Sequence, residues 1–311
     1  MKRRCLTAAV CLGLAVAACG QSATQPSPRE PAPAPRVVLS ADERELWAPG
    51  SPTRATVPVL LYHGLPAEAF ARQMALLAHA GYETITLEQL VRFVNRQPVS
   101  LPPRPILLTF DGGRLASWTQ TDGTLRELGF NAVLFVDVGR VEEKDPAYLT
   151  WEELNRLQRS GRWDVQLQSG TGNYEIKYGP DPGDVGPAYA YRGSDEVLGG
   201  WRERVFSDIT YGEEQLAFRV RNHRPLAFAP PDGNYGQAGT NDRRIPRQLL
   251  ARLQLSFQIV FTQDRPGHAT PGAPNPLGRI AVTRETTAAQ LRTLLQHQPS
   301  RRRADAVNVT A

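Results

Sequence analysis

The chain has 311 residues, of which 41% are hydrophobic and 22% charged, and this composition is ordinary for a globular protein. Three of its 36 Lys and Arg residues lie in the first four positions, which leaves 33 cations against 31 Asp and Glu. A charge balance so near neutral argues against a nucleic-acid-binding protein, and we expect no nucleic-acid partner.

Residues 1–18 are expected to form a lipoprotein signal peptide. A basic start precedes an apolar run, Leu6 to Ala18, that is too short to span a bilayer permanently. The end of this run, Val16-Ala17-Ala18-Cys19, resembles a bacterial lipobox, which implies cleavage before Cys19 and acylation of that cysteine. A plain signal peptide and a buried helix are the alternatives. Because Cys5 and Cys11 would leave with the signal, the mature chain could form no disulfide.

The rest of the chain divides into three parts. Residues 19–56 are expected to be the lipidated cysteine and a tether, since residues 21–36 are rich in Pro, Ser and Ala without an apolar period. Residues 57–298 form the expected globular domain, and residues 299–311 a polar, basic tail. We therefore expect a protein that is secreted across the inner membrane and lipid-anchored to the cell envelope.

Predicted strands alternate with predicted helices through the globular part. The alternation favours a parallel sheet, and a strand count near eight predicts an α/β fold, an irregular (β/α) barrel in a single domain. The strands are predicted at 57–63, 83–86, 105–110, 131–136, 164–168, 226–229, 257–261 and 279–282, and the helices at 68–80, 87–95, 115–128, 150–160, 246–253 and 288–296.

Residues 170–200 interrupt this alternation. They are rich in Gly, Pro, Tyr and Asp and have no clear period. A segment of this length without periodicity inside a compact domain is usually functional or disordered. It follows the end of a predicted strand, where barrel enzymes build their sites.

Polar or special residues stand at the ends of four of the predicted strands. They are Tyr62-His63, Asp111, Gln168 and the run Pro230-Pro231-Asp232-Gly233. Because the carboxyl ends of parallel barrel strands share one rim, these residues predict a site there. Taken singly, each is also explained as a helix cap or a turn residue.

Five segments in a fixed order are similar to the polysaccharide deacetylases of the NodB homology family, and most to the branch that acts on exopolysaccharide. The resemblance covers about Val57 to Leu295 and implies the NodB-type barrel. It also implies a divalent metal, commonly zinc, held by one aspartate and two histidines beside an aspartate base. The segments are Tyr62-His63-Gly64, Leu107 to Gly113, Leu149 to Leu154, Gln166 to Asn173 and Arg224 to Gly233.

The resemblance also implies that the metal site has degenerated. Asp111 matches the base, Gly112 matches the aspartate ligand, and Gln168 and Asn173 match the two histidines. Glycine offers no side chain and amide oxygens are poor zinc ligands, so all three ligand positions are lost. We expect no metal and no other cofactor.

Three further features bear on activity. Another register for the histidine pair, Gly170 with Glu175, also contains no histidine. Asp232 replaces a family tyrosine, and a carboxylate there would repel developing negative charge; alternatively, it rebuilds part of a cation site with Asp111. The resemblance places His63 beside the site, where it is either a vestigial catalytic group or a hydrogen-bonded residue of the barrel rim.

Three hypotheses about function follow. The first is a catalytically impaired envelope lipoprotein that binds or helps process an N-acetylated amino-sugar polysaccharide. The second is an active carbohydrate N-deacetylase that uses Asp111, Asp232 and His63 with a non-standard metal or none. The third is a structural partner of an exopolysaccharide synthesis or secretion complex. Candidate sugar-binding residues are Tyr62, Trp151, Trp163, Gln168, Asn173, Tyr174, Tyr178, Pro231, Asp232, Gly233 and Tyr235, although most of the aromatic residues among them are also explained as core.

Overall fold

A computed structural model describes residues 29–51, 53, 55–221 and 223–296. The predictions for the signal peptide, for Cys19 and for the basic tail at 299–311 therefore lie outside the described residues. Within the described part, none of the helices is both long and apolar enough to cross a membrane.

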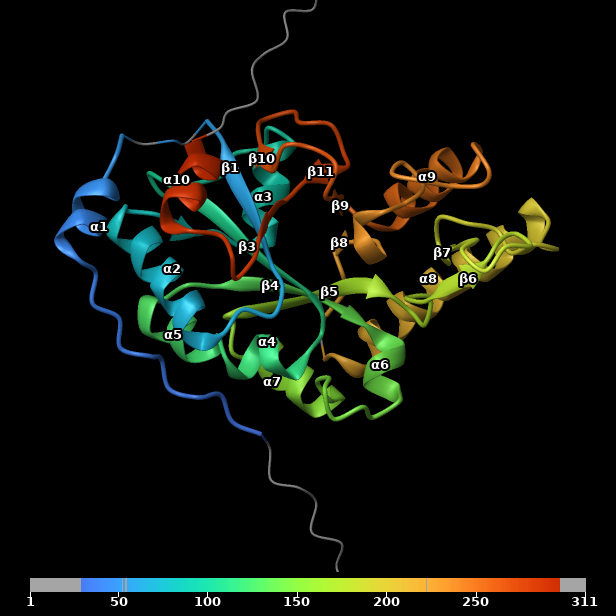
Figure 1. Ribbon diagram of the computed structural model, residues 1–311, viewed down its shortest axis with the longest axis horizontal. Helices are drawn as coiled ribbons and strands as arrows, with labels where there is room; N and C mark the ends of the chain where they lie inside the picture. Colours follow the sequence, from blue (N-terminus) through green and yellow to red (C-terminus); the bar gives the residue numbers. More distant parts are fainter. Residues whose placement is uncertain (1–28, 52, 54, 222, 297–311) are drawn as a thin grey trace, which may run out of the picture.

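Parallel strands build a nearly closed barrel, as predicted (Figure 1). Strand β10 (His268–Ala269) is antiparallel to β1, and β2 (Glu83–Thr84) pairs with β3. The remaining path runs through β1 (Val57–Tyr62), β3 (Pro105–Gly112), β4 (Ala132–Asp137), β5 (Trp163–Ser169), β8 (Ala227–Phe228), β9 (Ile259–Thr262) and β11 (Leu277–Gly278).

The barrel closes through one short stretch of chain. Strand β11 pairs with β9, and β12 (Ile280–Val282) pairs with β1, which lies at the other side of the sheet. Only Arg279 separates β11 from β12. We call the stretch Leu277–Val282 the barrel seam.

Side chains alternate between the two faces of the sheet, as the pleat requires. Leu107 and Phe135 belong to an interior cluster, where Phe135 meets Phe261 across the barrel with ring centres 5.6 Å apart. Leu108 and Leu134 belong to a second cluster, between the sheet and the helices. Helix α3 (Leu87–Val94) packs on the interior cluster and follows β2, which pairs with the amino end of β3. The carboxyl ends of the strands are therefore left for a site.

Four of the outer helices lie where they were predicted, one predicted helix is divided in two, and α8 (Leu198–Arg219) was not predicted. Helices α2 (Ala67–His79), α7 (Trp151–Arg159), α9 (Ile245–Ser256) and α10 (Ala288–Gln296) lie where they were predicted. The prediction of one helix over 115–128 is wrong, because α4 (Leu115–Thr119) and α5 (Asp122–Leu128) are separate. The carboxylate of Asp122 accepts hydrogen bonds of 2.8 Å from the side chains of Arg162 and Trp163, which fixes the start of α5.

The segment predicted as irregular contains a hairpin and leads into the longest described helix. Strands β6 (Glu175–Lys177) and β7 (Val185–Pro187) pair antiparallel, and α8 (Leu198–Arg219) follows. Figure 1 shows the hairpin and α8 in yellow, beside α9 and away from α1 (Ala41–Leu46) and α2. Two short elements, α6 (Val138–Glu142) and the 3₁₀ turn η1 (Pro231–Gly233), follow β4 and β8.

Residues 29–36, which belong to the predicted tether, form no helix or strand and lie against helices α4, α5 and α7. The Arg29 guanidinium binds both carboxylate oxygens of Glu153, at 3.0 and 2.8 Å. The Ala32 N–H donates to the last carbonyl of α4. At Gly123 a β-carbon would collide with the Ala32 carbonyl oxygen, so α5 needs glycine there. We call residues 29–36 the N-terminal strap.

Candidate functional site

A pocket of about 400 Å³ lies at the carboxyl ends of β1, β3 and β5. Six of its residues were predicted from the sequence, and the structure brings them together. Arg114, Tyr148 and Gln263 were missed, because they lie in loops that carry no periodic signal. The lining residues are His63, Asp111, Gly112, Arg114, Tyr148, Gln168, Asn173, Asp232 and Gln263.

Asp111 is paired with an arginine that the sequence analysis did not single out. Both terminal nitrogens of Arg279 donate to the Asp111 carboxylate, at 2.6 and 2.8 Å. The two side chains are 0% and 5% exposed, and the guanidinium carbon lies 5.5 Å from the centre of the Phe135 ring. The sequence did contain a signal for this ion pair, because Arg279 lies inside the apolar run Leu277–Val282 and a buried arginine needs a carboxylate partner.

The turn after Asp111 has a backbone that favours glycine. Gly112 has a φ of +89° and Gly113 a φ of +67°, which side-chain-bearing residues rarely adopt. A β-carbon on Gly113 would lie 3.1 Å from Val136. At Gly112 there is room, since the nearest atom would be 3.9 Å away in Arg114. A side chain at the family's aspartate position would therefore have room here but would need a strained backbone.

Helix α8 holds the loop that joins Gln168 to Asn173. The carboxylate of Asp208 accepts hydrogen bonds from the N–H groups of Gly170 and Thr171, at 3.0 and 2.5 Å. It also accepts from the hydroxyl of Thr171 at 2.9 Å and from that of Tyr189 at 2.6 Å. Gln168 itself is buried, and its Oε1 has no hydrogen-bond partner among the described residues.

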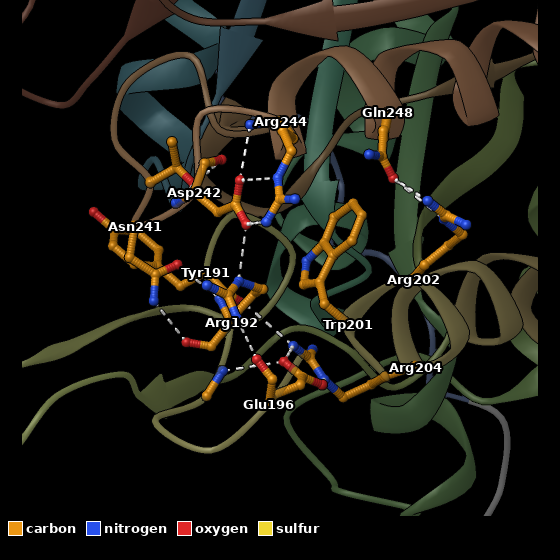
Figure 2. A network of polar contacts seen from close by, with 12 residues as sticks. Tyr191, Arg192, Glu196, Trp201, Arg202, Arg204, Asn241, Asp242, Arg244 and Gln248 are labelled. Carbon is orange, nitrogen blue, oxygen red and sulfur yellow. Dashed lines mark hydrogen bonds and ion pairs between the residues drawn. The ribbon is translucent and has the colours of Figure 1, made fainter. Parts of the chain in front are cut away.

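The hairpin segment is held by a network of ion pairs (Figure 2). Asp242 lies 3.0 Å from Arg192 and 2.7 Å from Arg244, and Arg204 of α8 lies 2.8 Å from Glu196. Hydrogen bonding and charge from Arg244, with further charge from Arg192, hold the pKa of Asp242 well below its usual range. This network orders part of the segment predicted to be functional or disordered.

Buried beside the pocket is another carboxyl, Asp137 at the end of β4. Burial raises its pKa to about 6, against opposing hydrogen bonding from Ser169 and Asn173. The native state therefore binds more protons than the unfolded state between about pH 4 and pH 6. Stability contributed by the neutral carboxyl is present below that window and is lost as pH rises through it.

We expect Asp137→Asn to raise the free energy of unfolding by about 3 kcal/mol at about pH 8, because a neutral amide avoids the charged state that burial disfavours. At about pH 4 the variant and the parent should be nearly equal. Urea unfolding at both pH values measures this. A gain of the same size at both values would assign the effect to packing instead of ionisation.

Several predicted sugar-binding residues lie outside the pocket lining. Tyr62 is buried and stacks on Phe110 with ring centres 5.5 Å apart. It points away from the pocket because neighbouring strand residues point to opposite faces and His63 lines the pocket. Trp163 is buried in the cluster between the sheet and the helices, and Tyr235 is buried with its hydroxyl 3.3 Å from Arg265. Trp151 is half-buried and packs on the cluster between the sheet and the helices, whereas Tyr174 is exposed. Tyr178 stacks on Tyr191. Pro231 and Gly233 are buried on either side of Asp232.

The residues of the pocket do not fit the family's zinc. Gly112 has no ligand atom, and Gln168 and Asn173 offer amides in place of imidazole. In the part of the chain that the structure describes, no group of three His, Cys, Asp or Glu could hold a metal ion. A cation site shared by Asp111 and Asp232 is also disfavoured, because Arg279 already balances the charge of Asp111.

Sequence comparison agrees with this geometry, since residues 99–244 match the family model described as polysaccharide deacetylase. The chain therefore contains a polysaccharide deacetylase domain. The predicted family and fold are thus confirmed. The residues at the family's three metal-ligand positions are nevertheless a glycine, a glutamine and an asparagine. No curated protein matches the chain in sequence.

Solved deacetylase structures share the fold of this chain. A de-N-acetylase from Aggregatibacter actinomycetemcomitans is similar with a TM-score of 0.67 and 15% identity, over 77% of this chain and 99% of that one. IcaB from Ammonifex degensii has a TM-score of 0.62 and 23% identity, over 80% and 99%. The BpsB deacetylase domain from Bordetella bronchiseptica has 0.60 and 21%, over 76% and 98%.

Proposed function

We propose that this protein is a catalytically impaired envelope lipoprotein that binds or helps process an N-acetylated amino-sugar polysaccharide. The observation that carries the proposal is the pocket itself: the three residues that match the family's metal-ligand positions all line it, and none of them is an aspartate or a histidine. Amide groups stand at two of these positions, and amides pair well with sugar hydroxyls because each offers both donors and an acceptor. The similarity to IcaB and to the BpsB deacetylase domain supports a polysaccharide as the ligand.

Binding of partly N-acetylated glucosamine oligomers, measured by calorimetry, tests this proposal. The double variant Gln168→Ala, Asn173→Ala should bind about tenfold more weakly, because it removes two neutral hydrogen-bonding groups from the pocket. Gln215→Ala on α8 is the matched control and should bind like the parent, since Gln215 lies outside the pocket lining. A parent protein that shows no binding up to millimolar oligomer would remove the proposal.

A second candidate function is a surviving N-deacetylase. It is favoured by Asp111 and His63, which both line the pocket. Asp111 would accept a proton from the attacking water, as a general base does. Release of acetate from N-acetylated oligomers that disappears in Asp111→Asn supports this candidate. Absence of release with every divalent cation tried, and with none added, rules it out.

Lipid anchoring at Cys19 is part of the same proposal. Cys19→Ser should move the protein from the membrane fraction to the soluble fraction, because acylation of that cysteine is the anchor that the lipobox-like sequence implies. Cell fractionation and immunoblotting measure the shift. Membrane association that is unchanged in the variant contradicts acylation at Cys19.

Crosslinking in cells tests the third hypothesis, a partner in exopolysaccharide synthesis or secretion.

A further inference from the structure

The pocket contains one carboxylate that forms no ion pair in the described part of the chain. Of its two carboxylates, Asp111 is paired with Arg279. Asp232 is exposed and, among the described residues, has neither a hydrogen bond nor an ion pair. The other unpaired charge of the lining is Arg114, which is also exposed and lies over the ring of Tyr148, 5.1 Å from its centre. A cationic ligand group would therefore be attracted to Asp232.

The same pocket offers no niche for a methyl group. None of its nine lining residues has an aliphatic side chain, and Tyr148 is its one large apolar ring. An acetamide methyl placed there would gain little from burial, because burial stabilises a methyl group mainly against apolar surroundings. The lining thus favours a small polar group over an acetyl group.

Hydrogen-bonding capacity points the same way. An ammonium group has three donors and no acceptor, so it needs oxygen acceptors around it. Gln168, which is 5% exposed, is one of the lining residues, and its buried Oε1 accepts no hydrogen bond among the described residues. The Asp232 carboxylate adds two further acceptor oxygens. A buried acceptor without a donor is unfavourable until a ligand supplies one.

We propose that this pocket recognises the free ammonium group of de-N-acetylated amino-sugar units, with Asp232 as the residue that determines the preference for amine over acetamide. The inference rests on the proposed binding of an amino-sugar polysaccharide. It names the unit of that polymer that enters the pocket. A protein of this kind would bind the product of a deacetylation reaction.

Paired calorimetric titrations test the preference. Fully de-N-acetylated and fully N-acetylated glucosamine oligomers of equal length are titrated into the purified protein at about pH 6, where the sugar amine is protonated. The parent should bind the amine form about tenfold more tightly, and Asp232→Asn should bind both forms alike. Asn adopts the left-handed backbone of position 232, where φ is +57°, so this variant should fold. Glu203→Gln, which removes an exposed charge outside the pocket, should keep the full preference.

The outcomes separate this inference from the proposed function. Equal affinity for both oligomers, or a preference for the acetylated one, overturns the inference and leaves polysaccharide binding standing. A full preference for the amine in Asp232→Asn overturns the role of Asp232. If Glu203→Gln loses the preference for the amine as fully as Asp232→Asn does, the preference comes from nonspecific charge attraction, and the role of Asp232 is overturned as well. Failure of the parent to bind either oligomer removes both the inference and the proposed function.

Discussion

Replacing Arg279 with methionine should lower the free energy of unfolding by about 3–5 kcal/mol, because it leaves the buried Asp111 carboxylate without its partner. The guanidinium donates to both oxygens of Asp111 and is itself fully buried at the barrel seam. Methionine has a similar length and no charge, so the lost ion pair should account for most of the effect. Urea unfolding monitored by circular dichroism measures the change.

Two further variants control this experiment. Arg244→Met breaks an ion pair whose arginine is 64% exposed and should change stability much less than Arg279→Met does. The double variant Asp111→Asn, Arg279→Met should be more stable than the sum of the two single changes predicts, because it leaves no unpaired charge. If Arg279→Met is as mild as Arg244→Met, the buried pair does not stabilise the barrel.

Restoring three ligands should create a zinc site where the parent has none. The triple variant Gly112→Asp, Gln168→His, Asn173→His is expected to bind zinc at least about 10³-fold more tightly than the parent, since all three positions line one pocket. The backbone at Gly112, with φ at +89°, opposes this gain by about 1–2 kcal/mol. Competition titration with a chromophoric zinc chelator measures the affinity.

The single variants are the controls for this reconstruction. Each should bind zinc weakly, because one protein ligand leaves the metal mostly hydrated. Gln168→His, Asn173→His with Gly112 retained should bind less tightly than the triple variant. A triple variant that binds no better than the parent would mean that the assignment of Gln168 and Asn173 to the histidine positions is wrong.

Much of the barrel could be predicted because its strands carry the information locally. The apolar runs of β1, β3, β4 and β5 are buried on both faces, as parallel strands require, and each is separated from the next by a helical pattern. The site was predictable for the same reason. His63, Asp111 and Gln168 lie at or directly after strand ends, and strand ends meet at one rim.

Helix α8 was missed although its sequence contains a signal. Its buried residues recur every three or four positions, which is the helical period. The Gly199-Gly200 pair at its start and the irregular hairpin before it hid this pattern. The buried positions are Trp201, Val205, Ile209, Gly212 and Leu216.

Other parts of the site depend on contacts that no local pattern encodes. The pairing of Arg279 with Asp111 joins residues 168 positions apart, and the hold of Asp208 on Thr171 spans 37. Each is a consequence of barrel closure or of the packing of α8. The exclusion of Tyr62 from the pocket could have been predicted. Side chains alternate between the two faces of a strand, so Tyr62 and His63 cannot both face the pocket.

With the proposed acylation at Cys19, the N-terminal strap would limit how far from the membrane this pocket can reach. Arg29 donates to the backbone carbonyl of Tyr148, whose side chain lines the pocket, so the chain leaves the domain next to the site. With the proposed acylation at Cys19, about ten residues join the lipid to this point, and a fully extended chain of that length reaches only about 36 Å. The part of the tether that could extend freely is therefore shorter than residues 19–56. The pocket would stay within a thin layer above the bilayer. Polymer strands emerging from that membrane would meet it before strands already released into the surroundings.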